Sequence, residues 1–136
     1  MAGELRCVVV TPERQVLDEV VDFVALPMYD GELGVLPSRA PLIGRLGFGE
    51  LRARRGELTQ RYYIDGGFAQ VRGNVVTVLT PRAIKAEEID PQAATRALQA
   101  ALAPAPTPDA QEARLKAQLR ARAQLRISQR VRGEAG

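Results

Sequence analysis

The sequence predicts an N-terminal β domain followed by a C-terminal pair of antiparallel helices. Two observations predict this β + α organisation. Up to about residue 85, short runs of apolar and β-branched residues alternate with turn-forming residues. Beyond that point glycine is absent until Gly133, and alanine, glutamine, leucine and arginine, which tolerate or favour helices, predominate. We therefore expect a β domain at residues 1–85 and a helical hairpin at residues 86–136.

The expected strands are short and closely spaced. No segment between them is long enough for the helix that usually connects parallel strands, so the pattern favours an antiparallel sandwich or barrel, and we interpret it as a sandwich. The strand-like runs are residues 5–10, 20–26, 62–64 and 75–79, and the turn signals include Thr11-Pro12, Asp30-Gly31, Arg55-Gly56-Glu57, Asp65-Gly66-Gly67 and Gly73-Asn74.

Asp90 and Pro91 mark the start of the first expected helix. An aspartate side chain can accept a free backbone N–H at a helix start, and proline fits the first helical position without losing a hydrogen bond. The helix is expected at about residues 90–103. The alternating prolines of residues 104–108 then end it, because they remove backbone donors and hold the chain extended.

The second helix is expected at residues 109–132, with Asp109 and Glu112 forming a capping box. Two helices joined by a short loop make an antiparallel hairpin. The apolar residues of the second helix form a single thin row with a spacing of four residues, which predicts weak packing on the first helix or on the sandwich, and hence a mobile element. This row is Leu115, Leu119, Ala123, Ile127 and Val131.

Composition removes several classes of function. The chain has no histidine, which is the commonest general base and metal ligand, and only 4% aromatic residues with no tryptophan, which disfavours base-stacking sites. The single cysteine, Cys7, excludes an internal disulfide and a multi-cysteine metal site, and we expect it to be a buried strand residue. No nucleophile–base pair is visible, so we expect a binding or structural protein with no catalytic residue, no metal and no cofactor.

Positive charge is concentrated in the last quarter of the chain. The formal net charge of the whole chain is only +3, and the second helix carries most of the excess. This asymmetry points to an acidic partner surface, nucleic acid or anionic lipid. A small basic nucleic-acid-binding β domain is therefore an alternative function, although stacking aromatics and known binding motifs are missing. The basic residues are Arg114, Lys116, Arg120, Arg122, Arg126, Arg130 and Arg132, against Asp109, Glu112 and Glu134.

The densest motif is the run Asp-Gly-Glu-Leu-Gly-Val-Leu-Pro-Ser-Arg-Ala-Pro-Leu at residues 30–42. On its own it describes a turn-rich loop, and it lacks the Gly-Lys-Ser/Thr of a phosphate loop. Together with Gly-Glu-Leu at 49–51, Gly-Gly-Phe-Ala-Gln-Val at 66–71 and the passage 83–90, however, it resembles the epsilon subunits of F-type ATP synthases. The resemblance keeps order and spacing over residues 5–90.

The resemblance implies a ten-stranded sandwich that binds the gamma subunit and the membrane-embedded c-ring. It also implies a mobile helical hairpin that either folds onto the sandwich or extends into the catalytic head. The chain would then be a non-catalytic central-stalk subunit of a proton- or sodium-translocating enzyme, peripheral at the cytoplasmic face of the bacterial inner membrane. Its membrane association would pass only through the complex, and nucleic acid would not be a partner.

Carried over by motif, Glu32 would face the polar loops of the c-ring, whereas the residue pattern alone is also explained by a solvated turn carboxylate. The arginines Arg122, Arg126 and Arg130 would contact the acidic C-terminal loop of the catalytic beta subunits and inhibit ATP hydrolysis. One departure concerns the residues after Pro37, where bacterial members often have Gly-His and this chain has Ser38 and Arg39. Serine loses the freedom of glycine, and arginine brings a permanent charge.

Some bacterial members of the family bind ATP on the folded hairpin, through Ile/Leu-Asp-x-x-Arg-Ala in the first helix and Arg-x-x-x-Arg in the second. Ile89 and Asp90 match the first element, but Ala93 stands where its arginine should be. Arg122 and Arg126 match the second element, and two arginines one turn apart can bind phosphates. ATP binding is therefore possible but not favoured.

Overall fold

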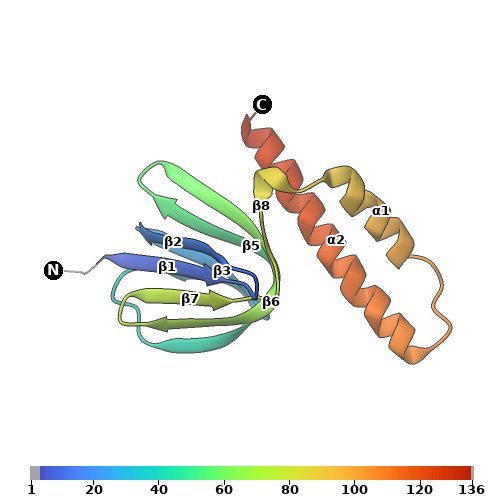
Figure 1. Cartoon of the computed structure of the whole chain (residues 1–136), viewed down its shortest axis with the longest axis horizontal. Coiled ribbons are helices and arrows are strands. Elements are labelled where there is room, and N and C mark those ends of the chain that lie inside the picture. Colours follow the sequence, from blue (N-terminus) through green and yellow to red (C-terminus); the bar gives the residue numbers. More distant parts are fainter. Residues whose placement is uncertain (1–3, 136) are drawn as a thin grey trace. The chain divides into compact units, whose positions relative to one another are not determined.

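The computed structural model describes residues 4–135, with side chains for residues 4–133, and it divides into two compact units, Met1–Lys85 and Ala86–Gly136 (Figure 1). Residues 1–3 and 136, which the expected domains include, lie outside the described residues. The first unit consists of strands, and the second contains two α-helices preceded by a short 3-10 turn.

The described part of the first unit holds eight strands in one continuous hydrogen-bonded network. The spatial order is β2-β1-β7-β6-β5-β3-β4, and β8 pairs with β6 beside this path. Strands β2 and β4 are therefore the two edges of the ordered path. The strands are β1 (Leu5–Val10), β2 (Gln15–Val21), β3 (Phe23–Met28), β4 (Gly31–Val35), β5 (Leu42–Arg55), β6 (Leu58–Arg72), β7 (Val75–Leu79) and β8 (Ala83–Lys85).

One pairing departs from the antiparallel sheet that the sequence predicts. Strands β1 and β7 run parallel, from Arg6 opposite Val75 to Val10 opposite Leu79. Parallel neighbours need a long connection, which is usually a helix. Here the connection consists of strands β2 to β6, which form the rest of the domain before the chain returns to β1. The lack of a crossover helix in the sequence therefore does not exclude a parallel pair.

Strands β5 and β6 are long because each belongs to both layers of the sandwich. Their pairing keeps one register from Leu42 opposite Val71 to Arg55 opposite Leu58, and only the pair at positions 47 and 66 is missing. At that point both strands bend, as the ribbon of β6 shows (Figure 1). The half of β6 before the bend pairs with β8, and the half after it pairs with β7. Counted layer by layer, β5 and β6 each appear twice, which accounts for the expected ten-stranded sandwich.

The bend depends on Gly67, the second glycine of the Gly-Gly-Phe motif. Its φ angle of +107° lies in a region that side-chain-bearing residues rarely adopt. A Cβ atom at this position would lie 2.0 Å from the carbonyl oxygen of Leu79 and 2.9 Å from the Cα atom of Thr80. The backbone of the chain therefore fills the space that any other residue would need.

The core lies between the two layers and follows the strand alternation. In β1, for example, Leu5, Cys7 and Val9 are fully buried while the residues between them face outward. Each fully buried large aliphatic side chain stabilises the fold by about 1.5–3 kcal/mol. The other core residues are Leu17, Val21, Val24, Leu26, Val35, Leu46, Leu51, Ala53, Tyr62, Ile64, Ala69, Val71, Val76 and Val78.

The prediction that Cys7 is a buried strand residue is confirmed. Burial raises the pKa of its thiol to about 12, and the carboxylates of Glu19 and Asp18 add to the shift. Because the thiolate is the nucleophilic form, a thiol that stays protonated at neutral pH is unreactive.

The first helix, α1 (Pro91–Ala101), starts as the sequence predicts. The Asp90 carboxylate accepts hydrogen bonds from the backbone N–H groups of Gln92 and Ala93 at 3.0 and 3.2 Å. The helix ends at Ala101, not at Ala103, because the residue before Pro104 is kept out of the helical conformation.

The second helix, α2 (Pro108–Ala135), starts one residue earlier than predicted and continues beyond residue 132. The predicted capping box is wrong: the hydroxyl of Thr107 accepts the N–H of Ala110 at 3.1 Å, so Thr107 is the cap and proline takes the first helical position. Glu112 instead lies 3.7 Å from Lys116, one turn further on. Gly133 does not end the helix, since a single glycine costs only about 1 kcal/mol there.

Within the helical unit, most of the fully buried side chains of α1 and α2 are small. Ala94, Ala101 and Ala121 are buried, and the Arg114 guanidinium and Gln118 amide donate to backbone carbonyls at the end of α1. Alanines bury little apolar area, so this packing is weak.

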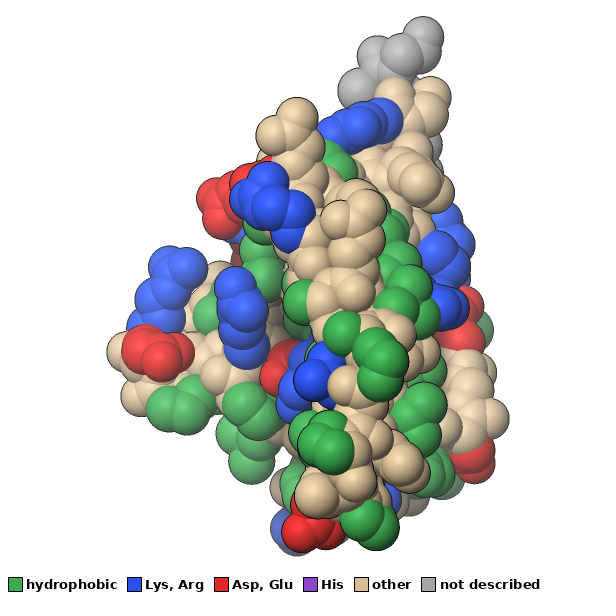
Figure 2. Space-filling view, turned by 90° about the vertical axis from the view of Figure 1, so that its right-hand side faces the viewer, with side chains coloured by type: hydrophobic (Ala, Val, Ile, Leu, Met, Phe, Trp, Pro, Cys, Tyr) green, Lys and Arg blue, Asp and Glu red, His purple; other side chains and the backbone are tan. Residues whose placement is uncertain are grey.

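The apolar row of α2 is split in consequence. Ala123 and Ile127 are buried, but Leu115 and Leu119 are more than half exposed, as is Leu102 after α1. Figure 2 shows hydrophobic side chains on the surface of this unit. Only residues in the second half of the row are therefore buried.

Replacing Gly67 by alanine should destabilise the β domain by about 3 kcal/mol or more, because the new methyl group adds backbone strain to an overlap with the Leu79 carbonyl. Gly56 is the matched control: its φ is +61°, but no atom lies within 4 Å of a Cβ placed there. Gly56→Ala should cost about 1 kcal/mol. Urea unfolding of the two variants measures both effects, and equal losses would contradict the steric account.

Candidate functional site

Glu32 lies in strand β4, opposite Pro27 of β3, and not in the turn formed by Tyr29 and Asp30. Its two carboxylate oxygens accept hydrogen bonds from Arg52 Nη1 and Nη2 at 2.9 and 2.7 Å. This paired geometry fixes the orientation of both side chains. The Glu32 carboxylate also raises the pKa of the Arg52 guanidinium. Glu32 is therefore an exposed strand carboxylate, just after the β3–β4 turn, that Arg52 holds in one orientation.

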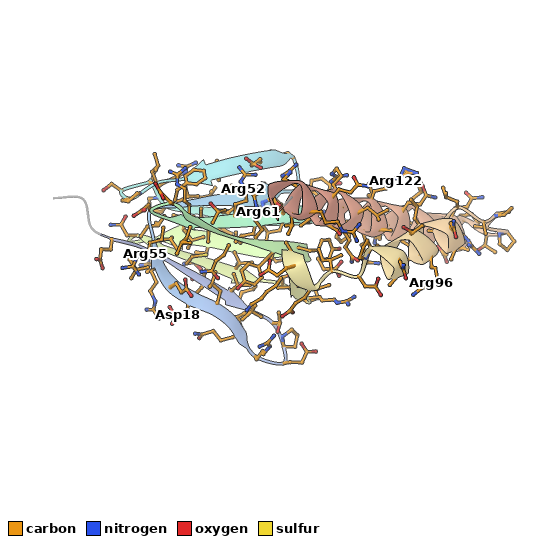
Figure 3. All side chains as sticks on the ribbon, turned by 90° about the horizontal axis from the view of Figure 1, so that it is seen from above. Asp18, Arg52, Arg55, Arg61, Arg96 and Arg122 are labelled. Carbon is orange, nitrogen blue, oxygen red and sulfur yellow. The ribbon has the colours of Figure 1, made fainter. Side chains whose placement is uncertain are left out.

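The pair belongs to a row of charges across β4, β5 and β6. Glu50, which is only 8% exposed, lies 3.5 Å from Arg52 and 3.2 Å from Arg61. Arg52 and Arg61 are opposite one another in the β5–β6 ladder, and Figure 3 shows them side by side. The Gly-Glu-Leu motif thus contributes a buried carboxylate to this row and, through Leu51, a fully buried core residue.

A groove of about 600 Å³ lies between the β3–β4 turn and the first residues of β5. On its wall the Arg45 guanidinium stacks over the ring of Tyr29, 4.3 Å from the ring centroid. Arg39, from the segment before β5, is half-buried in the same groove. We call this the turn groove; it is lined by residues 28–33, Arg39 and residues 42–45.

The loop before the turn groove is held by one side-chain hydrogen bond. Ser38 has a φ angle of +68°, and its backbone N–H donates to the Asn74 side-chain oxygen at 2.6 Å. Asn74 is itself left-handed, with φ +62°, in the β6–β7 turn. The serine that replaces the glycine of the family pattern therefore adopts the conformation for which glycine is best suited.

The outer surface of β5, β6 and β7 carries large apolar side chains. Ile43, Phe68 and Leu79 are 72%, 58% and 54% exposed, and Phe68 is paired with Leu79 in the ladder. They point outward because their neighbours Ala69 and Val78 fill the core. Ile43 also lines the turn groove, and we call Phe68 and Leu79 the outer apolar strip. Sequence analysis missed it, although the alternation after Gly67 could have revealed an apolar residue on the outer side.

The candidate residues of the helical unit fall into two groups. Arg122, Arg126 and Arg130 have exposed side chains at successive turns of α2. The two residues that match the first ATP-binding element are less available than these arginines. Ile89 is only 7% exposed, and the Asp90 carboxylate is engaged as a helix cap.

The missing arginine of that element is not supplied by a neighbour. Arg96, the arginine of α1, and Arg122 project from different sides of the helical unit (Figure 3). The structure therefore brings Arg122 and Arg126 onto one helix without placing an arginine of α1 beside Arg122.

Two features are absent from the part of the chain that the structure describes. Among these residues, no three histidine, cysteine, aspartate or glutamate side chains gather as a metal site would require. Neither α1 nor α2 has an apolar stretch long enough to cross a lipid bilayer.

Comparison of the sequence with known families gives one match over most of the β domain. Residues 4–86 match the family described as the ATP synthase delta/epsilon chain, β-sandwich domain. The ATP synthase epsilon chain of Rhodopirellula baltica is 55% identical over 91% of this chain and 98% of its own length. That of Carboxydothermus hydrogenoformans is 48% identical over 74% of this chain and 75% of its own length.

Solved structures resemble the chain over most of its length. A chain of the Euglena gracilis mitochondrial ATP synthase, in a structure of its OSCP, F1 and c-ring parts, superposes with a TM-score of 0.71 at 27% identity. The superposition covers 98% of this chain and 82% of that one. A chain of the central stalk and c-ring of the Tetrahymena thermophila enzyme gives a TM-score of 0.74 at 13% identity, covering 93% and 98%. The second likeness shows the fold alone.

Proposed function

Because the chain belongs to the family of ATP synthase epsilon chains, we propose that it acts as a non-catalytic rotor subunit that couples the membrane ring to the catalytic head. The relative from R. baltica matches this chain over both units, so the proposal concerns the whole chain and not its β domain alone. The observation that carries the proposal is that the β domain leaves large apolar side chains exposed on one outer face of β5, β6 and β7, as a subunit built into a larger assembly would.

The outer apolar strip is the surface that we assign to the gamma subunit. Aromatic and aliphatic side chains that are exposed in an isolated chain become the buried centre of an interface when the partner binds. Phe68 and Leu79 are neighbours across two strands, so their positions are fixed by the sheet and not by a loop. A rigid apolar surface costs little conformational entropy on binding, which suits a permanent contact that transmits torque.

The turn groove and Glu32 are assigned to the polar loops of the c-ring, a subunit named in the Euglena structure that this chain resembles. Glu32 is half-exposed while Arg52 holds it, so its carboxylate is oriented before a partner arrives. Fixed orientation lowers the entropic cost of binding.

The helical unit is assigned a regulatory role. Its alanine packing holds α1 and α2 together weakly, and the Arg122, Arg126 and Arg130 side chains face solvent one turn apart. Extended toward the catalytic head, this row would pair with an acidic loop of the beta subunits and block ATP hydrolysis. A change between two packings needs only a few kcal/mol, which a weak helix interface can supply.

Family membership also suggests where the chain lies in the cell and how it is attached to the membrane. The chain would lie at the cytoplasmic face of the bacterial inner membrane, attached only through the complex, whether the coupling ion is a proton or sodium. The complex would perform the catalysis, without a catalytic residue from this subunit. The alternative of a nucleic-acid-binding domain loses its basis under this proposal, because the basic α2 would then have an acidic partner within the ATP synthase.

Replacing Phe68 by glutamate should reduce binding to the gamma subunit by at least roughly tenfold, because a charge would be buried in the apolar contact. Leu58→Glu is the matched control, since Leu58 is also exposed, at 77%, but lies at the β5–β6 turn outside the strip. Co-purification and titration of the full chain with gamma measure both variants. Equal binding by the two variants would remove the outer apolar strip from the interface.

Truncation after Ala103 should raise the ATPase activity of the reconstituted complex, because it removes the basic second helix. The full-length variant with Arg122, Arg126 and Arg130 all changed to glutamine separates charge from bulk. If charge is the inhibitory agent, this variant should raise the rate as truncation does. An unchanged rate after truncation would argue against inhibition by the helices.

Binding of ATP to the isolated protein should be absent at micromolar concentrations, because Ala93 cannot supply the missing guanidinium and the Asp90 carboxylate is occupied as a helix cap. Titration calorimetry with MgATP measures this directly. Ala93→Arg restores the missing element of the motif and serves as the positive comparison. Micromolar binding by the unchanged protein would show that the incomplete motif suffices.

A further inference from the structure

The turn groove contains more positive charge than its own residues neutralise. Arg39 is half-buried there and makes no hydrogen bond or ion pair with any residue that the structure describes. Arg45 is held by its stacking on Tyr29, which engages the face of the guanidinium and leaves its edge N–H groups free to donate. Two guanidinium groups therefore line one groove with unused donors.

The carboxylates of the groove do not offset these cations equally. Glu32 is engaged by both terminal nitrogens of Arg52, which lies on the C-terminal half of β5 outside the groove lining. Asp30 is exposed at the β3–β4 turn and lies in no ion pair with Arg39 or Arg45. The groove thus presents two cations against one carboxylate without a cationic partner.

A guanidinium that is half-withdrawn from water without a partner is unfavourable, and an incoming anion relieves that cost. A carboxylate matches the forked donors of arginine in two parallel hydrogen bonds. The groove opens beside the β3–β4 turn, the part of the β domain that we assign to the rotor ring, so the occupant that fits is a protein loop carrying an acidic side chain.

We infer that the turn groove receives an aspartate or glutamate from the polar loop of the c-ring, bound by Arg39 and by the Tyr29-supported Arg45. The inference rests on the proposed function and deepens it by naming the chemistry of the ring contact. Arg39, which replaces the neutral residue of the family pattern, then makes the contact depend on a complementary acid in the ring of the same enzyme. Glu32 acts as a positioning residue at the edge of this contact.

The test measures the affinity of the full chain for a subcomplex of gamma and the detergent-solubilised c-ring from the same enzyme. Arg39→Glu should weaken binding by roughly tenfold or more, and Arg39→Lys by less, because lysine keeps the charge but not the fork. Arg55→Glu should bind as the unchanged chain does, since Arg55 is an exposed arginine at the far end of β5 (Figure 3). Thermal unfolding checks that each variant is folded, and Arg39→Gln gives a neutral comparison.

Two further variants test the geometry of the site. Tyr29→Phe keeps the aromatic face under Arg45 and should leave affinity unchanged, whereas Tyr29→Leu removes it and should weaken binding several-fold. A lysine in place of the acidic residue of the ring loop should weaken binding of the unchanged chain and restore that of Arg39→Glu. Raised salt should lower the affinity of the unchanged chain for the subcomplex more than it lowers the affinity of the Arg39→Gln variant.

The outcomes separate this inference from the proposed function. If the unchanged chain does not bind the subcomplex, the proposed function fails. If it binds and Arg39→Glu binds equally well, the function stands and the inference is overturned. Arg39-dependent binding to phosphatidylglycerol vesicles, without such dependence in the subcomplex, would assign the groove to a lipid headgroup and would also overturn it.

Discussion

The close approach of Gly67 to the backbone of Leu79 and Thr80 is the constraint on which the β domain depends. It allows β5 and β6 to leave one layer and enter the other without losing register. Because the same two strands serve both layers, they carry the outer apolar strip on one half and the Glu50–Arg52–Arg61 charges on the other. Two surfaces with different chemistry are thereby built on one hairpin, and a small domain can present separate faces to separate partners.

The two units differ in how firmly they are held. The β domain has a contiguous core of fully buried aliphatic side chains, whereas α1 and α2 meet through alanines and a few side-chain hydrogen bonds to backbone carbonyls. Since apolar burial is the main stabilising term, we expect the β domain to be the rigid part and the helix pair to be the part that rearranges at small cost. The exposed Leu115 and Leu119 are consistent with a helix whose apolar residues are not all used in one packing.

The sequence was sufficient for the order of strands and helices, for the buried Cys7 and for the Asp90 cap, because each rests on local alternation or local hydrogen bonding. It was insufficient for the parallel pairing of β1 with β7, which depends on where the chain returns 69 residues later, as from Arg6 to Val75. Two plausible caps two residues apart in a proline-rich segment made the start of the second helix ambiguous, and the structure has Thr107 and not Asp109 as the cap. The Arg52 partner of Glu32 and the stacking of Arg45 on Tyr29 required side-chain geometry that spacing does not contain.

The parallel pairing of β1 and β7 also sets an order of events during synthesis. Strand β1 leaves the ribosome first, and β2 is available to it almost at once as an antiparallel neighbour. Its other neighbour is not made until residue 79, after every other strand of the domain except β8. One edge of β1 therefore stays open through most of translation, and closure of the sandwich waits for a contact between distant parts of the chain, which is the slow kind of contact to form. The first strand to be made is among the last to be enclosed.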